Sequence, residues 1–94
     1  MPQYVIERDI PGAGKLTDEQ LKAVSLKSIE SLGQLGTHIQ WLHSYVAGDK
    51  VYCVHQAEDA DVIREHARVG GFPANLVVEV ASVFDRTGPR DLPS

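Results

Sequence analysis

A pair of β-type runs on either side of Gly48 and Asp49 constrains the fold of this chain more than any other feature. Residues 39–55 are rich in Val, Ile, Tyr and Trp, which favour a pleated and half-buried surface. A small turn pair between two such runs is a hairpin signal. The sequence therefore predicts a β-hairpin, and aromatic and ligand-type side chains crowd onto its two strands.

Two further strands and two helices are predicted around this hairpin. Residues 3–10 alternate and residues 76–84 are rich in valine, and both patterns are typical of strands. Thr17 and Gln20 have the spacing of a capping box, which predicts that a helix begins directly after Thr17. Acidic side chains at residues 58–61 suit the N-terminal end of a second helix, where the helix dipole favours negative charge.

The predicted order of elements is β-α-β-β-α-β. This order is typical of a ferredoxin-like α+β fold, in which both helices cover one face of an antiparallel sheet. We expect this domain to span residues 1–84 and to be followed by a C-terminal tail over residues 85–94. A chain of 94 residues buries a modest fraction of its surface as a monomer. We therefore also expect a homodimer that forms through or near the open, aromatic face of the sheet.

Composition narrows the expected partners and location. The net charge of −4 and the pI near 5.4, without a basic stripe, argue against nucleic acid and membrane surfaces as partners. The single cysteine, Cys53, excludes an internal disulfide, and the N-terminus lacks the features of an export signal, so we expect a cytoplasmic protein. Residues 12–17 lack the spacing of a Walker A motif, so no nucleotide cofactor is expected.

The position of the turn assigns the hairpin residues to two faces, because facing residues on paired strands share a face. Leu42 is expected to face His55, and Tyr45 is expected to face Tyr52. Cys53 and His55 would then pack under the helices. The aromatic residues of the open face would form a wall for a small-molecule ligand, and they are Trp41, Tyr45 and Tyr52.

The outer strands add carboxylates to the same open face. Alternation turns Glu7 outward in the first strand, and it turns Glu79 outward in the last strand if Val78 points into the core. Together with His43, these carboxylates form a ligand set that suits nickel or another divalent transition metal. The alternative interpretation is that both carboxylates are simply solvated.

His66 is expected at the edge of the helix–sheet interface. We predict that it joins the metal ligands, which gives the set Glu7, His43, Glu79 and His66. Cys53 and His55 point toward the same side, so a softer Cys/His/His site is an alternative. Two plainer interpretations also stay open, namely that Cys53 is a small buried hydrophobe and that His66 only forms a hydrogen bond. His38 is expected to be exposed.

Five segments of the chain have distinctive sequences. They are YVIER at residues 4–8, WLHSYV at 41–46, DKVYCV at 49–54, IREHAR at 63–68 and GFPA at 71–74. Together they resemble a family of small bacterial ferredoxin-like proteins of unassigned function that includes nickel-binding members. The resemblance covers nearly all of residues 3–84, and it implies a dimeric ferredoxin-like fold and a role in nickel sequestration. The chain is also similar to the wider group of dimeric α+β-barrel proteins, which includes cofactor-independent oxygenases and isomerases.

These observations lead to two main functional hypotheses. The first is a small cytoplasmic metal-binding protein that holds nickel or another divalent metal for sequestration or delivery. The second is a small dimeric α+β-barrel enzyme of the oxygenase or isomerase type. Its aromatic wall would hold a small aromatic or carbonyl compound, and Glu7, His43 or His66 would move a proton. A third interpretation is that the aromatic face serves only as a dimer interface.

Overall fold

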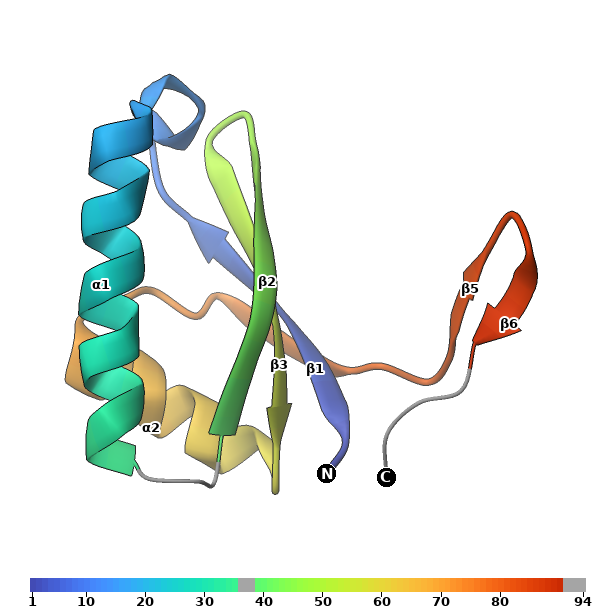
Figure 1. Cartoon of the computed structure of the whole chain (residues 1–94). Coiled ribbons are helices and arrows are strands. Elements are labelled where there is room, and N and C mark those ends of the chain that lie inside the picture. The colour runs from blue at the N-terminus through green and yellow to red at the C-terminus, as the bar shows by residue number, and fades with distance from the viewer. Residues whose placement is uncertain (36–38, 91–94) are drawn as a thin grey trace.

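The computed structural model describes residues 1–35 and 39–90, so the expectation for His38 lies outside the described residues. The elements in chain order are β1 (Gln3–Asp9), the 3₁₀ helix η1 (Ala13–Lys15), α1 (Asp18–Leu35), β2 (Ile39–Ala47), β3 (Lys50–Ala57), α2 (Ala60–Gly70), β4 (Leu76–Glu79), β5 (Val83–Asp85) and β6 (Gly88–Arg90). Helices α1 and α2 lie on one side of the main sheet (Figure 1). The expected α+β class, with two helices and an antiparallel sheet, is confirmed.

Four strands form the main sheet in the order β2-β3-β1-β4, and each neighbouring pair is antiparallel. The β2–β3 hairpin turns at Gly48 and Asp49, as predicted. Gly48 adopts a φ of 61°, which costs glycine little because it has no Cβ. Strands β5 and β6 form a separate two-stranded sheet that projects away from the rest of the molecule (Figure 1).

The strand predicted over residues 76–84 is wrong at its C-terminal end, because β4 ends at Glu79. Strand β4 pairs with β1, and the last bond of this pairing runs from the Val80 N–H to the Gln3 carbonyl at 2.8 Å. Strand β1 begins at Gln3, so it offers β4 no further residue with which to pair. The pairing therefore stops, and residues 83–90 pair with each other instead, so that part of the expected tail is a hairpin.

Local hydrogen bonds set the start of both helices. The Thr17 N–H donates to Gln20 Oε1 at 2.9 Å and the Gln20 N–H donates to Thr17 Oγ1 at 3.2 Å, so the predicted capping box is confirmed. The Asp59 carboxylate accepts a hydrogen bond from the Val62 N–H at 2.9 Å and caps α2. Helix α2 ends before Gly71, which adopts a φ of 72°.

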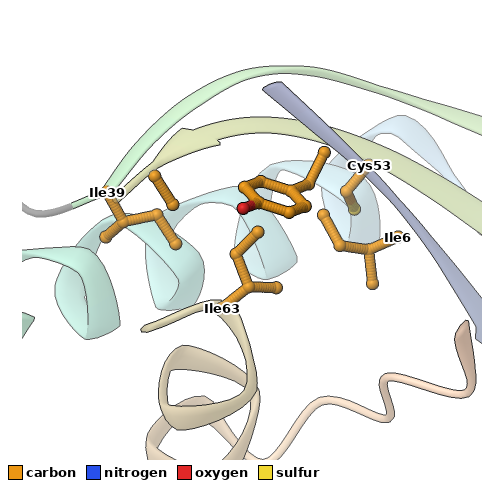
Figure 2. Close-up of a cluster of buried hydrophobic side chains, with 6 residues drawn as sticks. Ile6, Ile39, Cys53 and Ile63 are labelled. Atoms are coloured by element: carbon orange, nitrogen blue, oxygen red, sulfur yellow. The ribbon is translucent and has the colours of Figure 1, made fainter. Parts of the chain in front are cut away.

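The hydrophobic core lies between the main sheet and α2. Ile6 of β1 and Ile63 of α2 are fully buried, and Figure 2 shows both with Ile39 and Cys53. The complete cluster is Tyr4, Ile6, Ile39, Cys53, Ala57 and Ile63. Helix α1 contributes the partly buried Leu32, whereas its Val24 and Ile29 remain exposed. Helix α1 therefore covers the sheet less closely than α2 does.

Candidate functional site

A β-bulge in β2 divides the aromatic residues of the hairpin between the two faces of the sheet. The register between β2 and β3 shifts between Trp41 and His43, so Trp41 pairs with His55 where Leu42 was expected. The predicted position of Trp41 on the open face is therefore wrong. A bulge places one extra residue in one strand, and this reverses every face assignment on one side of it.

Trp41 lies beneath the helices as a result. Its indole Nε1 donates to Ser44 Oγ at 2.9 Å, and the Ser44 hydroxyl donates to Cys53 Sγ at 3.0 Å. This chain of hydrogen bonds crosses the bulge and ties β2 to β3 on the helix side. Trp41 is therefore held against the inner face of the sheet.

The other two aromatic residues lie on the open face, as predicted. Tyr45 pairs with Tyr52, and the rings of Tyr45 and His43 meet edge to face with centroids 5.1 Å apart. The Tyr52 hydroxyl donates to Glu7 Oε1 at 3.2 Å, and Lys50 Nζ lies 3.7 Å from the same oxygen. Glu7 is therefore paired with neighbouring side chains of the open face.

Glu79 lies on the opposite face from Glu7, which corrects the sequence-based assignment. It pairs with Tyr4, and Ile6 pairs with Val77, so the core residue of β4 is Val77 and not Val78. Burial, followed by the charges of Glu79 and Asp59, raises the pKa of Tyr4. The alternation in β4 is thus one residue out of phase with the predicted one, because the register with β1 sets it.

The four predicted metal ligands do not come together. Glu7 and His43 lie on the open face, Glu79 lies beside Tyr4, and His66 is buried in α2. Within residues 1–35 and 39–90, no group of three or more His, Cys, Asp or Glu side chains could hold a metal ion.

The structure instead brings His66 to His55, which belonged to the alternative Cys/His/His site and not to the predicted set of four. Their rings lie with centroids 5.3 Å apart, and each side chain is 1% exposed. Nδ1 of His55 and both ring nitrogens of His66 form no hydrogen bond of good geometry in the described part of the chain, although the Ser28 backbone lies close enough to His66 to affect its pKa. Two sequence signals pointed to this pair, namely the alternation of β3, which places His55 on the helix side, and the expected place of His66 at the helix–sheet interface.

Both imidazoles are held in the neutral form. Burial lowers the pKa of His55 to about 3, and the charges of His66 and Arg8 act in the same direction. Burial, followed by the Arg8 charge, also lowers the pKa of His66, and the Ser28 backbone opposes this shift. A neutral imidazole keeps a free lone pair on its unprotonated nitrogen, so each ring of the pair can ligate a metal ion.

A cavity of about 430 Å³ lies between α1 and the sheet. It is lined by Arg8, Ile10, Leu16, Leu21, Val24, Ser25, Ser28, Trp41, Ser44, Val46, Val51, Cys53 and Phe72. Arg8 is buried in this wall, where its Nε donates to Cys53 Sγ at 3.4 Å and its Nη1 donates to the Pro73 carbonyl at 2.7 Å. The size of the cavity depends on how closely α1 packs on the sheet, which the sequence does not specify.

The antiparallel sheet, its two helices and the groups buried beneath them define a small α+β protein with candidate sites under the helix layer. The chain belongs to the family described as nickel responsive protein SCO4226-like, whose model matches residues 4–80, so the resemblance seen in the sequence is confirmed.

A solved structure has a similar fold. It is the crystal structure of SCO4226 from Streptomyces coelicolor A3(2), which is 16% identical in sequence and has a TM-score of 0.69. The match covers 84% of this chain and 95% of that chain. No curated protein matches the chain. In the described residues, neither α1 nor α2 has the length and apolar character of a segment that crosses a membrane.

Proposed function

We propose that this protein binds a divalent transition metal ion, with nickel as the first candidate, and sequesters or delivers it in the cytoplasm. The family description names nickel responsiveness. The observation that carries the proposal is the His55–His66 pair, which has three buried ring nitrogens without a hydrogen bond of good geometry among the described residues. Buried polar atoms without partners are rare in folded proteins, and a ligand is one explanation for them.

The residue types of this pair fit nickel. Imidazole is a favourable ligand for nickel, copper and zinc. Metal–imidazole bonds are about 2.0–2.1 Å long, so two rings with centroids 5.3 Å apart are close enough to reach one ion. The ion would supply positive charge that neutral imidazole nitrogens can stabilise. The positive charge of Arg8 opposes metal binding, because it acts on both imidazole rings.

The metal proposal is tested by calorimetric titration of the chelator-stripped protein with nickel and zinc. We expect stoichiometric binding, weakened at least tenfold in both His55→Gln and His66→Gln. His43→Gln is the matched control and should bind like the wild type, because His43 is exposed on the other face. Arg8→Gln should bind more tightly, because it removes the opposing charge.

Circular dichroism must show that each variant is folded. Binding weaker than millimolar in the wild type, or equal affinity in all variants, would exclude the histidine pair as the metal site. The alternative enzyme hypothesis has less support. Its proposed proton-transfer residues Glu7 and His43 lie on the face opposite the cavity, and His66 does not line it.

We also propose that the protein is a ferredoxin-like homodimer. The strand order β2-β3-β1-β4 supports the ferredoxin-like assignment. The open face supports dimerisation, because Tyr45 is 61% exposed and Leu76 and Val78 are about half exposed on it. The β5–β6 hairpin carries an exposed Phe84 and projects from the body, where it could reach a second copy (Figure 1).

Sedimentation equilibrium tests the dimer. Tyr45→Glu should halve the measured mass, because it places a charge within the proposed interface. Leu26→Glu is the control, since Leu26 is an exposed apolar residue of α1 that is remote from the open face. A monomeric wild type at micromolar concentration would contradict the proposal.

A further inference from the structure

The cavity between α1 and the sheet has the properties of an organic ligand site. Its volume of about 430 Å³ lies within the range of roughly 300–1,000 Å³ that small-molecule sites occupy. Leu21 and Val24 of α1 face Trp41 and Val51 of the hairpin across it. A largely apolar wall of this kind suits the apolar body of an organic molecule and does not suit a hydrated ion.

Arg8 is the one charged side chain among the residues that line the cavity. It is 3% exposed, and its guanidinium carries a positive charge. A buried charge is costly unless it is paired with an opposite charge. Across the described residues, no carboxylate forms an ion pair with Arg8. The protein therefore holds a buried cation next to an apolar cavity without the expected anion.

The partners that Arg8 does have leave part of its guanidinium free. Its Nε donates to the Cys53 sulfur and its Nη1 donates to the Pro73 carbonyl, and neither acceptor is a carboxylate. The Phe72 ring lies 5.7 Å from the guanidinium carbon and fixes the group further. A guanidinium has five N–H donors, so several remain for an anionic ligand.

Three other polar side chains of the wall already form hydrogen bonds within the protein. The Trp41 N–H donates to Ser44, Ser44 donates to Cys53, and the Ser25 hydroxyl donates to the Leu21 carbonyl at 3.0 Å. A ligand would thus find a strong polar partner at the Arg8 end. Along the remaining wall it would meet mainly hydrocarbon and the indole face.

We propose that this cavity binds a small apolar monocarboxylate. Its carboxylate pairs with the guanidinium of Arg8, and its apolar body lies between α1 and Trp41. The carboxylate of the ligand supplies the negatively charged partner that Arg8 lacks within the protein. Guanidinium and carboxylate form strong, charge-assisted hydrogen bonds. This site is separate from the proposed metal site, because neither His55 nor His66 lines the cavity.

Intrinsic fluorescence provides a direct test, because Trp41 is the only tryptophan of the chain. The full chain is titrated with decanoate in the presence of a metal chelator, and the tryptophan emission is followed. We expect a saturable change at submillimolar decanoate, and decanol should bind at least tenfold more weakly because it has no charge for Arg8. Equal binding of decanol and decanoate, or no saturable change with decanoate, would overturn the proposal without the use of any variant.

Two variants and a control locate the site. Arg8→Gln should weaken decanoate binding at least tenfold, although it should strengthen nickel binding. Ser25→Phe should abolish decanoate binding, because the added ring fills the cavity that Ser25 lines. Lys50→Gln should leave binding unchanged, since Lys50 pairs with Asp9 outside the cavity. Decanoate binding by a folded Arg8→Gln protein with wild-type affinity would also reject the proposal.

Discussion

Replacing Ile6 with alanine should lower the free energy of unfolding by about 3 kcal/mol, within the usual range of roughly 2–5 kcal/mol for such a truncation. Ile6 is fully buried, and it lies between Cys53 of β3 and Val77 of β4 in the central strand. The smaller side chain leaves a cavity that the surrounding strands cannot fill by moving. Because small domains are stable by only about 5–15 kcal/mol, this loss is a large part of the total.

Urea denaturation followed by circular dichroism measures this effect. Leu26→Ala is the matched control, because Leu26 is 59% exposed on α1 and its truncation removes little buried surface. We expect it to change the free energy of unfolding by less than about 0.5 kcal/mol. Similar losses for both variants would contradict the packing of β1 at the centre of the core.

The second large effect is a loss of stability in mild acid. His55 is held neutral, with its pKa lowered from 6.5 to about 3 by burial, by His66 of α2 and by Arg8 of β1. In the unfolded chain His55 therefore takes up a proton near pH 6.5, whereas in the folded chain it takes up this proton only near pH 3. The stability contributed by neutral His55 is present above pH 6.5 and is lost as the pH falls from 6.5 toward 3.

Between pH 7 and pH 5 this linkage should lower the free energy of unfolding by about 2 kcal/mol through His55 alone. His66 adds to the effect, because its pKa is also lowered. Urea denaturation of the metal-free protein at both pH values tests this. His55→Gln should remove much of the difference, whereas His43→Gln should retain it because both buried rings remain. A stability that is equal at pH 7 and pH 5 would show that the pair is not buried in the neutral form.

Elements that depend on contacts within a few residues were predicted correctly from the sequence. The capping box at Thr17 and Gln20 joins residues three apart, and the turn at Gly48 and Asp49 joins adjacent strands through local backbone geometry. The family resemblance was equally visible, because it rests on short segments of the chain. Hydrophobic alternation placed Cys53 and His55 under the helices, and both residues are buried there.

Parts of the candidate sites could not be predicted because they depend on strand register and on helix packing. Trp41 changes face because of one bulged residue, and Glu79 changes face because β1 sets the phase of β4. Each shift of one residue reverses the side of the sheet to which a side chain points. The predicted metal set and the predicted aromatic wall were therefore both divided between the two faces.

The sequence by itself determined the order of the helices and strands from β1 to β4, the turn of the hairpin and the capping box of α1, since those signals act between near neighbours in the chain. Only the tertiary structure decided that His55 meets His66, that Arg8 is buried without a carboxylate partner and that a cavity remains beneath α1. Those features arise from contacts between residues far apart in the sequence. Their energies depend on burial and register, which exist only once the helices have packed on the sheet.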